Sequence, residues 1–295
     1  MASQQDIRRR IRSVRSTHKI TKAMELVSAA KLRRAQLRIE AMRPYANRML
    51  ELIVATSQAA HPAHGLPLLA ARETGTVALF PLNGDRGLAG AFNAQVLRRA
   101  FALESSLEAQ GIAVKWMVSG KRGRSTLNFR KREIATSWSG FSDYPRFSDA
   151  QAIAHQVTAL YANAEVDAVL LVYNRYVTPI LQRVVEQEIL PLPKQVLEGF
   201  SDSAPAPSAT LGDVIYEPEA EEILARLLPA YLETEIYRSL LESAASEHGA
   251  RMTAMRNASK SADELIENLT LLMNRVRQAA ITQEILEVVA GADAL

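Results

Sequence analysis

LESAASEHGARMTAMRNASKSADELIENLTLLMNRVRQAA, residues 241–280, is the stretch that decides the fold. Its apolar and small residues recur at alternating steps of four and three, the heptad pattern of a helix that packs against another helix along a narrow stripe. Gly249 is the only glycine between Tyr231 and Glu287, so we expect one helix from about Glu219 to Val289, with Pro229 as a candidate kink. The seam positions are Leu241, Ala245, His248, Met252, Met255, Ser259, Ala262, Ile266, Leu269, Met273, Val276 and Ala280.

This predicted helix is too long to be buried by its own chain. A rise of about 1.5 Å per residue gives it a length of roughly 100 Å. A compact chain of this size would have a radius of gyration of about 19 Å. The helix should therefore project from a globular body and need a partner helix.

The partner is predicted at the other end of the chain. Residues 3–58 contain a single proline, Pro44, and no glycine, which predicts a second long helix. Its apolar residues form three runs that are offset from one another, and we interpret the offsets as stutters in a coiled coil. The runs are Ile7, Ile11 and Val14; Ile20, Met24 and Val27; and Leu32, Ala35, Ile39 and Met42.

Charge favours pairing of the two ends. Residues 1–50 carry 13 Lys or Arg and 3 Asp or Glu, a balance of +10, although the whole chain has a net charge of only +3. From residue 231 onward, 6 cationic residues face 10 acidic ones, a balance of −4. The two terminal segments are electrostatically complementary, so we expect an antiparallel coiled coil.

The middle of the chain has a different pattern. GTVALFPLN, IAVKWMVSG, REIATSW and DAVLLVYNRYV are typical of strands, and PILQRVVEQEILPL of an added strand. Amphipathic segments at 92–110 and 147–165 predict helices between them, so the fold class is α/β with a Rossmann-like central domain. The predicted division is 1–58 for the N-terminal coiled-coil helix, 75–198 for the α/β base domain, 199–212 for a Pro/Ser/Ala linker and 213–295 for the C-terminal coiled-coil helix.

Residues for independent chemistry are scarce. The chain has no cysteine, its five histidines lack metal-ligand spacing, and no nucleophile and base pair stands out, so we expect no catalytic residue, metal or cofactor. NGDRGLAGAFN at 83–93 follows a strand and precedes a helix, but its glycines fit neither nucleotide-binding pattern. A tight turn is favoured there over a phosphate site, and KRGR at 121–124 is read as a solvated helix start.

Three functions remain open for a rod of this kind. The basic N-terminal helix could bind nucleic acid, but it has an acidic partner helix and almost no aromatic residue for base stacking. A membrane-surface helix is a second option, although the apolar stripe is narrow. The third is a mechanical rod whose end fits a protein socket, and the apolar end of the chain favours it. That end contains Ile281, Ile285, Leu286, Val288 and Val289.

Four motifs, in the right order along essentially the whole chain, resemble the γ subunit of F-type ATP synthases. They are IRRRIRSVRSTHKITKAMELVSAAKLRRAQ at 7–36, DRGLAGAFN at 85–93, VIYEPEAEEIL at 214–224 and ITQEILEVVAGA at 281–292. The resemblance implies an antiparallel, left-handed coiled coil standing inside a hexamer of α and β subunits. The chain would then be a non-catalytic rotor stalk that couples ion-driven ring rotation to ATP synthesis or hydrolysis at the β subunits. Ala89 departs from the family turn, which often has cysteine there.

The resemblance also implies which residues meet which partner. Arg277, Gln278 and Thr282 match positions that hydrogen-bond a loop of a β subunit. Met24, with Lys22 beside it, matches the region facing the acidic lever segment of β. The apolar end would turn in a sleeve formed by the hexamer.

At the opposite end the resemblance implies a foot that meets the c-ring and the ε subunit, although the two tyrosines in it could instead pack on the base domain. We expect no nucleic-acid partner and membrane association only through the complex, at the cytoplasmic face of a bacterial plasma membrane. The absence of a transit sequence is part of this expectation. The foot residues are Arg43, Pro44, Tyr45, Tyr216 and Glu217.

Overall fold

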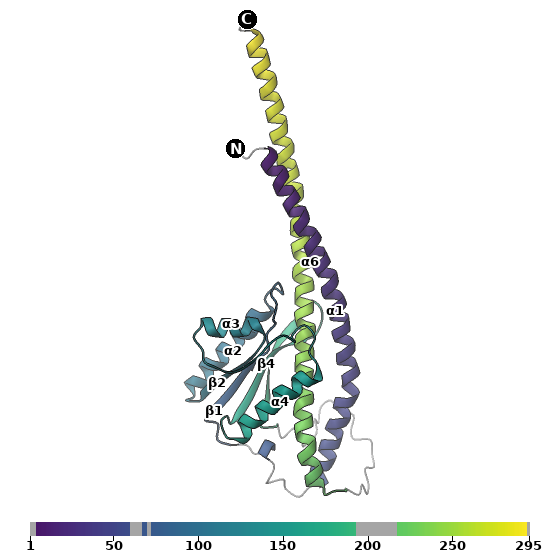
Figure 1. The fold of residues 1–295 in the computed structure, drawn as a ribbon, viewed down its shortest axis with the longest axis vertical. Helices are drawn as coiled ribbons and strands as arrows, with labels where there is room; N and C mark the ends of the chain where they lie inside the picture. Colours follow the sequence, from purple (N-terminus) through teal and green to yellow (C-terminus); the bar gives the residue numbers. More distant parts are fainter. Residues whose placement is uncertain (1–3, 60–66, 70–71, 193–216, 294–295) are drawn as a thin grey trace. The chain divides into compact units, whose positions relative to one another are not determined.

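The structure is a computed structural model that describes residues 4–59, 67–69, 72–192 and 217–293. Along the chain, a long helix comes first, an α/β region follows, and a second long helix comes last (Figure 1). The predicted fold class, a coiled coil of the terminal helices with an α/β domain between them, is confirmed. The predicted linker at 199–212 lies outside the described residues. The elements are α1 (Gln4–Ala59), η1 (Pro67–Leu69), β1 (Thr76–Pro81), α2 (Phe92–Ala109), β2 (Ala113–Ser119), α3 (Lys121–Phe129), β3 (Ile134–Trp138), α4 (Phe147–Ala162), β4 (Ala168–Tyr176), β5 (Gln182–Leu190) and α6 (Ala220–Asp293).

One five-stranded sheet forms the middle of the chain, with the strand order β3-β2-β1-β4-β5. The first four strands are parallel, and β5 pairs with β4 in the antiparallel direction. Each parallel step needs a crossover, and α2, α3 and α4 supply those crossovers. The added strand predicted at 179–192 is the antiparallel edge.

The sheet is covered on both faces, which explains its almost continuous apolar strands. In β1, Ala78 and Phe80 belong to a core that includes α4, Met49 of α1 and Leu232 of α6. Leu79 points to the other core, which is built with α2 and α3. The terminal helices therefore share one face of the sheet with α4, and α2 and α3 cover the other.

Gly84 and Gly120, which follow β1 and β2, lie where other parts of the chain approach closely. Gly120, at the end of β2, has a φ of +92°, and a Cβ there would lie 2.1 Å from the carbonyl oxygen of Asn83. A Cβ at Gly84 would lie 2.7 Å from the carboxylate of Glu247 on α6. A side chain at Gly120 would collide with the backbone, and one at Gly84 would displace the Glu247 carboxylate. These glycines let the loop after β1 pack against the start of α3 and against α6.

By contacts the chain forms two units. Residues 30–250 make up the unit with the sheet. Residues 1–29 and 251–295 make up the second, in which the start of α1 pairs with the last part of α6. Pro44 and Pro229 both lie inside continuous helices.

Candidate functional site

Three side-chain contacts fix how the ends of α1 and α6 pair. As the residue number rises along α1, the number of its partner on α6 falls, so the helices are antiparallel. In each pair the two residue numbers add up to 280 or 281, which sets one constant register. The pairs are His18 Nε2 with Asp263 Oδ2 at 3.3 Å, Thr21 Oγ1 with Ser259 Oγ at 2.7 Å, and Glu25 Oε1 with Arg256 Nε at 3.0 Å.

This register decides where the pairing stops. Gln4, the first described residue of α1, falls level with about residue 277 of α6 when the same register is continued. Beyond that level α6 continues alone to Asp293, and it passes the start of α1 in Figure 1. Every residue from 277 to 290 is exposed. The end of α6 is therefore a single helix that no part of the described chain covers.

The apolar side chains of this single helix are solvent-exposed. Contiguous apolar surface on a soluble protein usually marks an interaction site. No described residue of the chain contributes a cover for it. The exposed fractions are 49% for Ile281, 56% for Ile285, 63% for Leu286, 73% for Val288 and 50% for Val289.

The three residues predicted to contact a β-subunit loop lie at the base of the same single helix. Arg277, Gln278 and Thr282 are all exposed. Thr282 donates its hydroxyl hydrogen to the carbonyl oxygen of Gln278 at 2.9 Å, so its oxygen remains available as an acceptor. Arg277 forms no salt bridge with any described residue. Its guanidinium and the Gln278 amide can therefore face outward.

Lys22 and Met24, the other predicted contact, lie much further along the pair. The register places Lys22 level with about residue 259, which is 18 residues from Arg277 and thus about 27 Å along the helix axis. Met24 is half-buried, and Lys22 Nζ lies 3.0 Å from Glu25 Oε2. The structure therefore gives two separate candidate surfaces rather than one.

Glu25 is a buried carboxylate held between two cations. Its side chain is 8% exposed, and it accepts hydrogen bonds from Lys22 and from Arg256. First the Lys22 bond and then the Arg256 bond hold the pKa of Glu25 below its ordinary value. Glu25 stays ionised at neutral pH, so Lys22 is partly neutralised on its own helix.

The predicted seam of α1 was wrong in its second run. Ile20 and Val27 are 58% and 55% exposed, and Met24 is only half-buried. Thr21, Glu25 and Ser28 take the buried positions instead. Thr21 and Glu25 find a hydrogen-bonding and a charged partner on α6. Ser28 donates its hydroxyl hydrogen to the carbonyl oxygen of Met24 on its own helix at 2.7 Å.

With these residues included, the seam has no stutter. Its steps alternate between four and three from Ile7 to Thr56, and each position is buried or half-buried. That spacing is present in the sequence, but a pattern of apolar residues alone does not reveal it because several seam positions are polar. The seam positions are Ile7, Ile11, Val14, His18, Thr21, Glu25, Ser28, Leu32, Ala35, Ile39, Met42, Ala46, Met49, Ile53 and Thr56.

The predicted foot residues are exposed where the structure describes them. Arg43, Pro44 and Tyr45 lie on the outer surface of α1, and Tyr45 is 55% exposed. Glu217 is exposed just before α6, whereas Tyr216 lies outside the described residues. The alternative in which Tyr45 packs on the base domain is thus disfavoured.

The loop after β1 already holds an anion from its own chain. Asp85 Oδ1 accepts the backbone N–H of Lys121 at 3.0 Å, at the start of α3. Asp85 Oδ2 accepts the backbone N–H groups of Gly140 at 2.8 Å and Ser142 at 3.2 Å. A phosphate at this helix start would need the same donors, so the geometry favours the tight turn over a phosphate site.

The described residues offer neither a metal-binding cluster nor a membrane-spanning helix. They contain no group of three or more His, Cys, Asp or Glu placed to hold a metal ion. None of their helices combines the length and the apolar character needed to cross a membrane.

Comparisons with known proteins cover the whole chain. The profile of the protein family described as ATP synthase matches residues 3–295. The ATP synthase gamma chain of Rubrobacter xylanophilus is 46% identical over 100% of this chain and 99% of its own length. That of Moorella thermoacetica is 43% identical over the full length of both chains.

Solved structures agree in fold. A chain of the central stalk and c-ring of the Tetrahymena thermophila mitochondrial ATP synthase has a TM-score of 0.60 and 29% identity, covering 81% of this chain and 99% of that chain. A chain of the Euglena gracilis mitochondrial ATP synthase has a TM-score of 0.70 over 99% of this chain and 94% of that chain. At 16% identity, the second likeness concerns the fold alone.

Proposed function

The chain belongs to the ATP synthase gamma chain family, and we infer that it is the central rotor stalk of an F-type ATP synthase. It is a non-catalytic subunit that couples ion-driven rotation to ATP synthesis or hydrolysis elsewhere in the complex. The observation that carries this inference is the helix register, because it leaves residues 277–290 exposed as a single helix beyond the pairing.

The exposed apolar end suits a bearing that turns in a sleeve of α and β subunits. Ile285 and Val289 follow Ile281 at steps of four, and Leu286 and Val288 widen the apolar surface on either side. Contacts between apolar surfaces are not directional, so their energy changes little as the helix rotates. A surface rich in hydrogen bonds would instead favour a few fixed angles.

Torque would be transmitted at two heights of the shaft. Arg277, Gln278 and Thr282 would hydrogen-bond a loop of one β subunit near the tip. About 27 Å lower, the surface of Lys22 and Met24 would face the acidic lever segment of β. A shaft that met every β subunit alike would shift none of them, so function requires this asymmetric placing of contacts.

The foot and the location in the cell complete the proposal. Arg43, Pro44, Tyr45, Tyr216 and Glu217 would meet the c-ring and the ε subunit, while the α and β hexamer holds the other end. The division into terminal helices, base domain and linker likewise stays a prediction.

With bacterial relatives and no described membrane-spanning helix, the chain would attach through its complex to the cytoplasmic face of the plasma membrane. Neither nucleic acid nor a cofactor has a place in this arrangement.

The proposed tip contact is tested by Arg277→Ala with Gln278→Ala. Loss of two hydrogen bonds should lower ATP synthesis by about thirtyfold, because each is worth roughly 1 kcal/mol. The measurement is the rate of proton-driven ATP synthesis in membrane vesicles, normalised to the amount of assembled complex.

The matched control replaces Arg275 and Gln283 with alanine, since both are exposed on the same helix and neither is a predicted contact. Its synthesis rate should stay near that of the unchanged complex. An unimpaired rate in the Arg277 and Gln278 variant would show that these side chains do not form the contact.

A further inference from the structure

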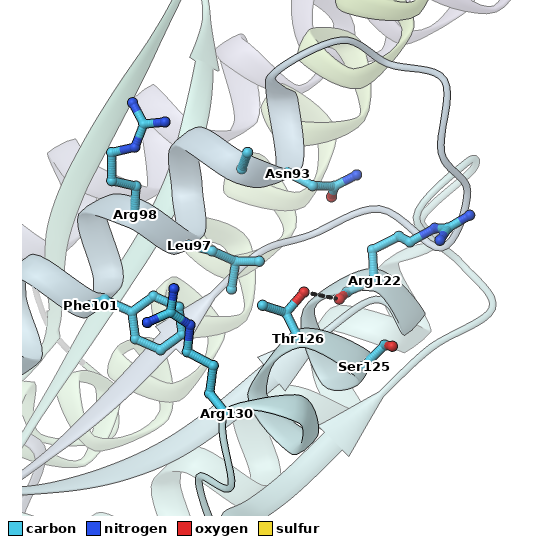
Figure 2. A pocket seen from close by; sticks show the side chains of 9 residues that line it. Asn93, Leu97, Arg98, Phe101, Arg122, Ser125, Thr126 and Arg130 are labelled. Carbon is cyan, nitrogen blue, oxygen red and sulfur yellow. Dashed lines mark hydrogen bonds between the residues drawn. The ribbon is translucent and has the colours of Figure 1, made fainter.

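A pocket of about 510 Å³ lies between α2 and α3, on the face of the sheet opposite the terminal helices (Figure 2). Its volume is within the range of small-molecule sites. The proposed rotor function makes no use of it. The lining residues are Asn93, Ala94, Leu97, Arg98 and Phe101 from α2, and Arg122, Ser125, Thr126 and Arg130 at α3.

The pocket has an uncompensated positive charge. Among the described residues, no carboxylate forms a salt bridge with Arg98, Arg122 or Arg130. Arg99 and Arg132, which are close in sequence but outside the pocket, pair with Glu186 and Glu104 respectively. The chain thus neutralises neighbouring arginines and leaves those of the pocket available for an external anion.

The two ends of the pocket differ in chemistry, as Figure 2 shows. One end contains Asn93, Arg122, Ser125 and Thr126, which supply an amide, a guanidinium and two hydroxyls. Thr126 donates to the carbonyl oxygen of Arg122 at 3.0 Å, while the Ser125 hydroxyl is exposed. This end matches the donor-rich surroundings of a bound phosphate.

The other end presents a flat surface. The guanidinium carbon of Arg130 lies 4.7 Å from the centroid of the Phe101 ring, and Figure 2 shows the two stacked. Leu97, which is 6% exposed, lies between the two ends. A planar ring gains energy by stacking on such a guanidinium and aromatic surface.

Side chains must carry the binding, because the backbone donors nearby are in use. The N–H of Lys121 is bound to Asp85, and the N–H of Arg122 to the carbonyl oxygen of Gly84 at 3.2 Å. The start of α3 therefore adds little to the pocket. Binding should depend on individual arginines and respond to their replacement.

We propose that the pocket between α2 and α3 binds a small phosphorylated ligand that carries a planar ring, of the mononucleotide class. The phosphate lies at Arg122, Ser125 and Asn93, and the ring stacks at Arg130 and Phe101. The proposal concerns the base of the molecule and does not depend on the rotor function.

The test is isothermal titration of the purified full chain with AMP, ribose 5-phosphate and inorganic phosphate at about 0.15 M salt, where surface charge is screened. AMP should bind saturably, and at least about fivefold more tightly than ribose 5-phosphate because stacking adds roughly 1–3 kcal/mol. Arg122→Gln should weaken all phosphate-containing probes by about tenfold. Arg130→Gln should reduce the preference for AMP while leaving ribose 5-phosphate unchanged.

The matched control is Arg124→Gln, which removes an exposed arginine of α3 that does not line the pocket and should leave AMP binding unchanged. Thermal unfolding of each variant verifies that the base is folded. The proposal is overturned if no probe binds, if Arg122→Gln binds AMP normally, or if AMP and ribose 5-phosphate bind equally. Arg122-dependent binding of an acidic peptide without binding of AMP would overturn it in favour of a protein contact.

Discussion

At the scale of single residues, Asp85 gives a structural role to a loop whose sequence resembles a phosphate-binding loop. Its two carboxylate oxygens bind backbone N–H groups from the start of α3 and from the loop after β3. One side chain therefore joins three segments at the carboxyl edge of the sheet. The sequence indicated a turn here from the glycine spacing, but the long-range partners Gly140 and Ser142 could not be read from it.

Replacing Asp85 with alanine should lower the free energy of unfolding of the base by about 2 kcal/mol, because the N–H groups lose a charged acceptor. The chain has only two tryptophans, Trp116 and Trp138, and both lie in the sheet. Urea unfolding followed by tryptophan fluorescence therefore reports on this region. Glu108→Ala, an exposed carboxylate on α2, is the control and should change little. Equal stability of the two variants would contradict the role given to Asp85.

At the scale of elements, the seam between the terminal helices was predictable in its period but not in all its members. The α6 pattern placed Met252, Met255 and Ser259 correctly on the buried stripe. On α1, following apolar residues alone selected Ile20 and Val27, which are exposed. A polar residue can occupy a buried seam position only if a partner satisfies it, and that partner lies some 240 residues away in the sequence.

The hydrogen bond between Thr21 and Ser259 gives a direct test of these buried polar positions. Thr21→Val alone should cost about 1 kcal/mol, because the buried Ser259 hydroxyl loses its partner. Combining it with Ser259→Ala should recover most of that loss, since no hydroxyl then remains unsatisfied. Chemical unfolding of the full chain, followed by far-UV circular dichroism, measures both changes.

Thr17→Val is the matched control, because Thr17 is exposed on the same helix and bonds only to the Ser13 carbonyl oxygen of its own turn. It should produce no change that Ser259→Ala can offset. If the Thr21 and Ser259 changes simply add, the two hydroxyls do not depend on each other.

At the scale of the whole molecule, periodicity and charge predicted the class of fold, and the described strands confirm the predicted α/β order. The exposed end of α6 followed from the sequence only as an apolar stretch. Where the single helix begins required the register, because it depends on which residue of α1 stands level with which residue of α6. The prediction at this scale therefore concerns the part of α6 that extends past the start of α1.

Ending the chain after Ala280 removes the apolar part of the single helix and leaves the paired seam intact. We expect the complex to assemble, to retain ATP-driven rotation and to lose its γ subunit faster on dilution. Retention is measured by gel filtration of the complex at decreasing concentration. Complete failure of assembly would instead make the end of α6 an anchor for building the complex.

The unpaired end of α6 also couples two equilibria, which are the helix–coil equilibrium of its last turns and its binding to the hexamer. Residues 277–293 extend a helix that is already nucleated, but packing energy from α1 stops at their first turn. Fraying from the carboxyl end therefore competes with helix until another surface covers it. Folding of the last helical turns and binding to the hexamer are then coupled. The measured affinity therefore includes the entropy cost of ordering the end of the chain.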